Sequence, residues 1–162
     1  MKKLAIFLTV VTAIALILVF YQLYASNLRL EVTRVDITPA SQRADAFGGL
    51  LTAARRGDLE HSLYRADIPD DPAQCVLVTI TLSLRNHGLL PAEWIDVEVE
   101  PMPGDYLRVP NASIDLRALR YTDLSIVLLS GLESAGEPRP LHITYYVLGR
   151  PMRLTLTTPR SQ

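Results

Sequence analysis

The chain begins with a long apolar segment and continues with short runs in which apolar and polar residues alternate. No charged residue occurs from Leu4 to Leu28, and the most strongly apolar part ends at about Phe20. A helix needs about 20 apolar residues to cross the hydrocarbon core of a bilayer. Tyr21 and Tyr24 follow at the place where interfacial aromatic residues are enriched. The pattern predicts one N-terminal transmembrane helix that contacts the lipid bilayer through residues 4–24.

A cleaved signal peptide is the alternative interpretation of the same segment. Signal peptides have an apolar centre of roughly 7–15 residues and a small-x-small cleavage site. The apolar run in this chain is longer, and cleavage after Ala25 would put the bulky Leu23 at the −3 position. We therefore favour an uncleaved anchor over residues 1–27 and keep the cleaved signal as the alternative.

The positive charges beside this segment indicate its orientation. Lys2, Lys3 and the terminal amine flank one side, whereas Arg29 and Arg34 lie on the other. Lysine and arginine close to a membrane span favour the cytoplasmic side. The sequence predicts a cytoplasmic N-terminus and an extracytoplasmic domain over residues 28–160.

Most of that domain has the alternation of β-strands. In Cys75–Arg85, five apolar residues share one face: Val76, Val78, Ile80, Leu82 and Leu84. The other face is polar, and this period of two is typical of a half-buried antiparallel strand. Asn86-His87-Gly88 follows with turn chemistry. Further strands are predicted at Trp94–Glu100, Tyr106–Val109, Leu124–Leu129, Leu141–Leu148 and Met152–Thr157, with Gly149-Arg150-Pro151 as the last hairpin turn.

The strand predicted at Leu28–Thr38 contains a change of phase. Its apolar residues occupy even positions up to Val32 and odd positions from Val35 onward. One extra residue in a strand moves all later side chains to the opposite face. We therefore expect a β-bulge near Thr33-Arg34.

Residues 41–66 do not alternate, and they predict a helical insertion. This stretch is rich in alanine and leucine, and Phe47, Leu50 and Leu51 have helical spacing. Ser41 is the candidate N-cap, and Arg55-Arg56-Gly57 has the composition of a helix C-terminus. A second short helical piece is predicted from Asp58 to Tyr64.

Together these elements predict a mainly β fold, an immunoglobulin-like antiparallel β-sandwich with a short helical insertion, preceded by one transmembrane helix. The segments VTITLSLRNHG (78–88) and AEWIDVEVEPMP (92–103) resemble those of bacterial immunoglobulin-like or fibronectin-III-like envelope modules, and also the LEA14-like sandwich. The resemblance covers roughly residues 75–157 and departs from these families at the helical insertion. It implies a binding or scaffolding role and carries over no catalytic residue.

The sequence contains few residues that could form a catalytic or metal-binding site. The chain has one cysteine, Cys75, and three widely spaced histidines, so it can form no intrachain disulfide and contains no metal-ligand motif. Neither a nucleophile elbow nor a phosphate-binding glycine loop occurs. We expect no catalytic, cofactor-binding or metal-binding residues, and therefore no enzyme. Residues 29–162 carry 14 arginines against 17 acidic residues, which argues against nucleic-acid binding.

Trp94 is the single tryptophan, and it should point away from the core if Ile95 and Val97 face inward. It could cap a sheet edge, mark a contact surface or cover the helical insertion. We favour packing against residues 41–66, because that amphipathic stretch needs an apolar cover. The possible contact surface predicted from the sequence consists of Trp94, Phe47, Leu50 and Leu51.

The sequence thus favours a membrane-anchored, extracytoplasmic, non-catalytic binding or scaffolding module whose partner is another envelope protein. The alternative is a secreted or anchored carrier that holds an apolar ligand between sandwich and helical insertion. A hydrolase that uses Cys75 or His61 is the least favoured hypothesis, since no triad pattern accompanies them.

Overall fold

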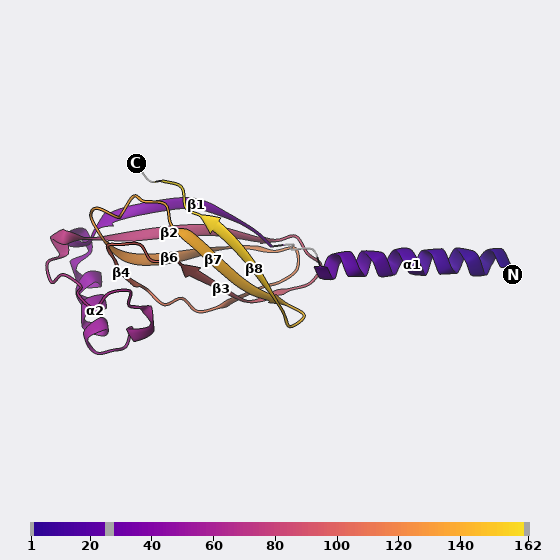
Figure 1. The fold of residues 1–162 in the computed structure, drawn as a ribbon, viewed down its shortest axis with the longest axis horizontal. Coiled ribbons are helices and arrows are strands. Elements are labelled where there is room, and N and C mark those ends of the chain that lie inside the picture. Colours follow the sequence, from indigo (N-terminus) through magenta and orange to yellow (C-terminus); the bar gives the residue numbers. More distant parts are fainter. Residues whose placement is uncertain (1, 25–27, 161–162) are drawn as a thin grey trace.

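The computed structural model describes residues 2–24 and 28–160, and it consists of one helix followed by a β-sandwich (Figure 1). The long helix α1 covers Lys2–Tyr24. The eight strands are β1 (Leu28–Pro39), β2 (Cys75–Asn86), β3 (Ala92–Val99), β4 (Asp105–Arg108), β5 (Ile114–Leu116), β6 (Tyr121–Gly131), β7 (Pro140–Val147) and β8 (Arg150–Thr157). The remaining helical elements are η1 (Ala40–Arg43), α2 (Ala44–Arg55), η2 (Glu60–Ser62) and η3 (Pro72–Gln74).

The strands form two antiparallel sheets with the orders β1-β2-β6-β4 and β5-β3-β7-β8. Immunoglobulin constant-type domains have the sheets A-B-E-D and C-F-G. Assigning β1, β2, β3, β4, β6, β7 and β8 to A through G reproduces both orders, and the short β5 adds an edge beside β3. The predicted immunoglobulin-like sandwich is therefore confirmed by its strand order.

The main core lies between the two sheets and uses the residues that the alternation placed on inner faces. Ile80 and Leu82 of β2 and Val97 of β3 are buried, as predicted. Burial of each such side chain stabilises the fold by about 1.5–3 kcal/mol. Strand β7, which lies beside β3 in the same sheet, contributes Leu141, Ile143 and Tyr145.

The β-bulge in the first strand is confirmed. Val32 pairs with Leu82 and Arg34 pairs with Thr81, so Thr33 is the extra residue. The Thr33 hydroxyl donates a hydrogen bond to the Thr81 carbonyl oxygen at 3.1 Å. The bulge explains how apolar residues on both sides of it face the same core.

The helical insertion is confirmed with one correction at its start. The helix α2 ends at Arg55 and is followed by Gly57 with a φ of 81°, as the sequence predicted. Ser41 is not its N-cap, because Ser41 lies inside the preceding turn η1 and Arg43 occupies the cap position. Pro39 ends β1 directly before η1, so the chain turns before α2 begins. The second predicted helical piece is only the single turn η2.

The last hairpin turn lies one residue earlier than predicted. Val147 pairs with Arg150, so Leu148 and Gly149 form the two-residue loop. Their φ angles of 50° and 73° are both positive, which is the signature of a type I′ turn. Pro151 is tolerated in β8 because β8 is an edge strand.

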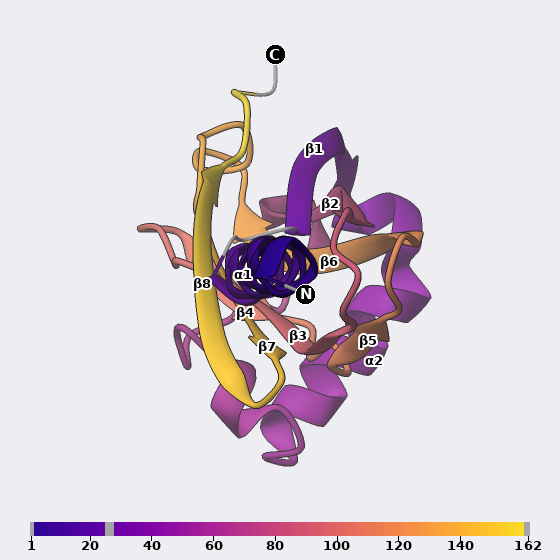
Figure 2. The ribbon, with the colours of Figure 1, turned by 90° about the vertical axis from the view of Figure 1, so that its right-hand side faces the viewer.

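The sandwich has two distinct ends (Figures 1 and 2). At one end, which we call the α1-proximal end, β1 begins four residues after α1 ends. The loops 87–91 and 117–120 and the turn 148–149 lie at this end, because strands β2, β5 and β7 finish there. The opposite, α1-distal end carries α2, the loops 100–104 and 132–139, and the last described residues.

Candidate functional site

The helical insertion covers the outer face of the β1-β2-β6-β4 sheet at the α1-distal end. A second, smaller core forms there, separate from the one between the sheets, and Phe47 of α2 is buried in it against Leu77 and Leu129. This explains why β2 is continuously buried from Cys75 to Val78 and alternates only afterwards. The sequence carried a signal for this second core, since Leu77 is an apolar residue on the face that otherwise holds threonines.

The segment after α2 is attached to β4. Tyr64 and Arg65 donate backbone hydrogen bonds to the Tyr106 carbonyl oxygen at 2.8 and 3.1 Å. The Tyr64 hydroxyl donates to the Val99 carbonyl oxygen at 3.0 Å, and burial raises the pKa of this hydroxyl. The insertion is therefore a fixed part of the fold.

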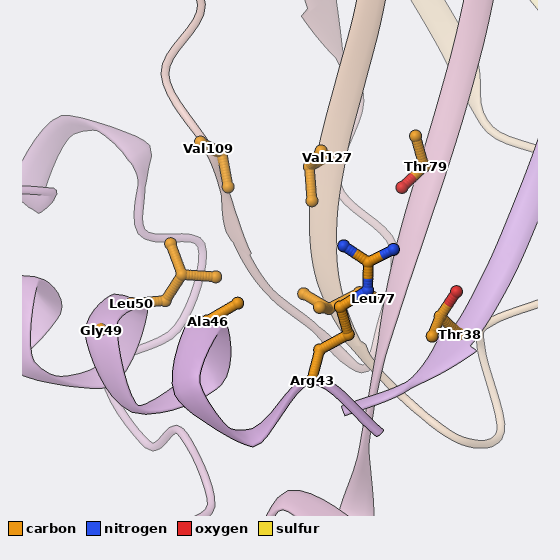
Figure 3. Close-up of a pocket in the computed structure, with 9 residues that line it drawn as sticks. All are labelled: Thr38, Arg43, Ala46, Gly49, Leu50, Leu77, Thr79, Val109 and Val127. Carbon is orange, nitrogen blue, oxygen red and sulfur yellow. The ribbon is translucent and has the colours of Figure 1, made fainter. Parts of the chain in front are cut away.

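Beside this contact, an open groove of about 450 Å³ lies between α2 and the sheet (Figure 3). Its floor is formed by side chains of β2 and β6, among them Leu77 and Val127, and its helical wall includes Ala46 and Leu50. The full lining is Thr38, Arg43, Ala46, Gly49, Leu50, Leu77, Thr79, Val109 and Val127. The volume lies in the range of small-molecule sites, about 300–1,000 Å³.

One cationic group lies at this groove. The guanidinium of Arg43 extends over the groove toward Thr38 and Thr79 (Figure 3). Among the described residues, no carboxylate forms an ion pair with Arg43. An apolar floor with one cation and two hydroxyls at its edge matches an aliphatic molecule that carries an anionic group.

The structure separates the residues of the predicted contact surface. Leu50 lines the groove, while Phe47 and Leu51 pack in or against the second core. Trp94 lies at the α1-proximal end, and its side chain is 68% exposed. The prediction that Trp94 packs against residues 41–66 is wrong, because that insertion lies at the other end of the sandwich.

The error arises because alternation gives the outward orientation of Trp94 but not its sheet. Strand β3 belongs to the β5-β3-β7-β8 sheet, whereas the insertion covers the other sheet. A bulge in β3 also lies at this residue. The pairing of β3 with both neighbours shifts across Glu93 and Trp94, and Trp94 has a φ of 53°. The Trp94 amide donates at 2.8 Å to the side-chain carboxylate of Asp115 in the neighbouring strand β5, and not to a backbone carbonyl. Such a bulge re-aims a side chain, and the alternation of the sequence does not reveal it.

The candidates for covalent chemistry lie apart from this groove. Cys75 is 1% exposed and belongs to the second core. Burial raises the pKa of its thiol, which disfavours the nucleophilic thiolate. His61 is exposed in η2. No group of three or more histidine, cysteine, aspartate or glutamate side chains that could hold a metal ion is found in the described part of the chain.

Comparisons with known proteins find solved structures of low similarity. Neither a protein-family model nor a curated protein sequence matches this chain. The solved GAE domain of yeast GGA1 aligns at 15% identity with a TM-score of 0.40, over 52% of this chain and 89% of the domain. A FixG-related protein from Vibrio parahaemolyticus aligns at 10% identity with a TM-score of 0.42, over 85% of this chain and 100% of that structure. At these scores no function is transferred, and the fold assignment rests on the strand order.

Proposed function

We propose that this chain is a single-pass membrane protein whose sandwich is an extracytoplasmic, non-catalytic binding or scaffolding module of the cell envelope. The observation that carries this proposal is the uncovered helix α1. Its apolar window Lys2–Tyr21 has 20 residues, and the described sandwich buries none of it. A helix that is apolar on all sides is stable in a protein core or in lipid. At 1.5 Å per residue, the window is about 30 Å long, which is the thickness of the hydrocarbon core.

The proposed orientation follows from the charges. Lys2 and Lys3 are the only lysines and lie at the N-terminal end of α1. By the positive-inside tendency, this end is cytoplasmic. The sandwich then lies outside the cytoplasm, where we propose another envelope protein as its partner.

Alkaline washing of membranes combined with protease treatment from the outer side tests this proposal. We expect the full-length protein to stay with alkali-washed membranes and its sandwich to be digested from outside. Val11→Lys, near the centre of the window, should lower the fraction of protein that inserts, because a charge there costs about 2.5–3.5 kcal/mol on insertion. The matched control, Val11→Leu, should stay inserted. A wild-type protein that washes off, or a sandwich protected from external protease, contradicts the proposal.

A second candidate function is the carriage of an apolar ligand, and the groove beneath α2 favours it. The chemistry of this groove fits an aliphatic chain with a carboxylate or phosphate beside Arg43. Gly48 and Gly49 offer a matched pair of variants. A Cβ atom added at either position meets no atom within 4 Å, but only Gly49 lines the groove.

A fluorescent fatty acid titrated onto the full-length protein in lipid nanodiscs tests ligand carriage, with protein-free nanodiscs as the blank. We expect saturable binding that Gly49→Leu abolishes and Gly48→Leu preserves. Equal effects of both variants, or no binding beyond the blank, would remove the carrier function and leave the anchored module untouched.

A further inference from the structure

Large apolar side chains are exposed mainly at one end of the sandwich. Within residues 28–160, six are more than half exposed, and five of these lie at the α1-proximal end. The sixth, Leu132, is at the α1-distal end. The five residues, which we call the proximal apolar set, are Leu89, Trp94, Leu119, Tyr121 and Leu148, with exposed fractions from 61% to 76%.

Three members of the proximal apolar set are held in a backbone conformation that bulky residues avoid. The φ angles of Trp94, Leu119 and Leu148 are 53°, 57° and 50°, and no other non-glycine residue in the described chain has a positive φ. A left-handed conformation costs a bulky L-residue about 1–2 kcal/mol, which glycine or asparagine largely avoids. These residues thus reduce stability, and each leaves more than half of its surface exposed within the fold. Such a combination indicates a role in function.

The loops at the same end carry positive charge. The loops 87–91 and 117–120 and the turn 148–149 contain Arg117 and Arg120 and no acidic residue. Arg29 of β1 pairs directly opposite Arg85 of β2. Like charges in opposed positions repel each other and destabilise a sheet, unless an anion lies beside them. The strands at this end also carry the acidic residues Glu31, Asp123, Glu93 and Asp115, and Asp115 accepts a hydrogen bond from the Trp94 amide.

Chain connectivity places this end beside the membrane. Only three residues join Tyr24 of α1 to Leu28 of β1, and Leu28 is buried in the main core. Four Cα–Cα steps of 3.8 Å extend over at most about 15 Å. The side chain of Asn86, which pairs with Leu28, donates to the carbonyl oxygens of Leu90 and Leu116 at 2.8 and 3.2 Å. It thereby holds loops 87–91 and 117–120 next to the start of β1.

We propose that the α1-proximal end docks onto the outer surface of the bilayer that α1 spans. The proximal apolar set enters the headgroup region, and the nearby arginines contact anionic lipid phosphates. This inference rests on the proposed anchoring by α1 and adds a second, independent lipid contact. Docking fixes the tilt of the sandwich, so that the groove and α2 point away from the membrane toward other envelope components.

The single tryptophan makes docking measurable. The full-length protein is reconstituted in vesicles of phosphatidylcholine and phosphatidylglycerol in which a fraction of the lipid is brominated. Bromine quenches indole fluorescence only at close range, and these vesicles contain no other protein. We expect Trp94 to be quenched, and more strongly when anionic lipid is present, because each arginine at an anionic surface contributes about fivefold in binding.

The test variant combines Leu119→Asn with Leu148→Asn, because asparagine tolerates a positive φ better than leucine does. We expect it to unfold at higher denaturant concentration than the wild type and yet to lower the ratio of docked to undocked protein about tenfold. The matched control is Leu132→Asn, which changes an equally exposed leucine at the α1-distal end. It should leave the quenching unchanged.

The outcomes separate docking from anchoring. Protein that floats with the vesicles but shows no quenching of Trp94 overturns docking and leaves anchoring intact. Protein that does not float at all overturns the anchoring on which docking rests. If a photocrosslinker at Leu148 in native membranes captures a protein and no lipid, the proximal apolar set is a protein interface and docking is also overturned.

Discussion

Arg139 donates two parallel hydrogen bonds to the Asp105 carboxylate, from Nη2 to Oδ1 at 2.7 Å and from Nε to Oδ2 at 3.0 Å. Both side chains are almost fully excluded from solvent. The Arg139 guanidinium also donates to the carbonyl oxygens of Ser134 and Glu137 at 2.8 and 3.0 Å. Asp105 begins β4 in one sheet, and Arg139 precedes β7 in the other, so the pair joins the two sheets at the α1-distal end.

Removal of one partner of this pair should destabilise the fold strongly. For Asp105→Asn or Arg139→Met we expect a loss of about 3–5 kcal/mol. The first variant leaves the Arg139 guanidinium buried without its counter-charge, and the second leaves the Asp105 carboxylate so. Denaturant unfolding of the full-length protein in detergent measures the loss. The exposed pair Arg160–Glu137 is the control, and Arg160→Met should cost less than about 1 kcal/mol. Equal losses for the buried and the exposed pair contradict this account.

Asn86 should also be sensitive to substitution, even where the side chain keeps its shape. Its side-chain amide donates to the carbonyl oxygens of Leu90 and Leu116. In Asn86→Asp an oxygen would face these carbonyls, so we expect a loss of about 1–3 kcal/mol or more in unfolding free energy. Asn111 provides the contrast, because its Nδ2 is buried with no partner among the described residues. Asn111→Ala should leave stability within about 1 kcal/mol of the wild type, and a larger loss there would argue against the hydrogen-bond explanation.

Alanine substitutions of Gly48 in α2 and of Gly57 after it should change the stability of the fold in opposite directions. Gly48 lies inside the helix, where an added methyl group meets no atom within 4 Å. Gly48→Ala should therefore stabilise the fold by about 0.8–1.0 kcal/mol. Gly57 has a φ of 81° after the helix end, so Gly57→Ala should destabilise by about 1 kcal/mol. Thermal unfolding of both variants checks the pair, and a shift in the same direction for both would contradict the helix end at Arg55 and the left-handed Gly57.

The buried thiol should be slow to react in the native state. Burial raises the pKa of Cys75 above its ordinary value of 9.0. The folded state thus keeps its proton at a pH where the unfolded chain loses it, so this thiol's contribution to stability falls as pH rises above about 9. We expect maleimide to label Cys75 only after denaturation at neutral pH, and Cys75→Ala to flatten the alkaline loss of stability. Rapid labelling of the folded protein would refute this picture.

The alternation of residues predicted most of the sandwich because each strand has one buried face. The phase change at Val32 and Val35 even located the bulge at Thr33. The sequence did not reveal the bulge at Trp94, because Ile95, Val97 and Val99 after it alternate as they would in a regular strand. Local pattern therefore predicts the faces of a strand but not the left-handed residues within it.

Other features depend on contacts between distant parts of the chain. Asp105 and Arg139 are far apart in sequence, and nothing near either residue indicates that they meet in a buried pair. The prediction of Ser41 as the N-cap of α2 was wrong, because Pro39 and η1 turn the chain before α2 begins. The sequence predicted a ligand site between the sandwich and the insertion only in general terms. Nothing in the sequence around Arg43 indicates that it lines this groove together with Leu77.

Membrane anchoring by an uncleaved α1 is the central claim, and the intact mass of the protein in alkali-washed membranes tests it most directly. Our account predicts a membrane-bound species that retains residues 1–24, close to 18.0 kDa before any modification. A species shorter by about 25 residues, the length a cleaved signal peptide would remove, that is recovered in the soluble fraction would contradict it.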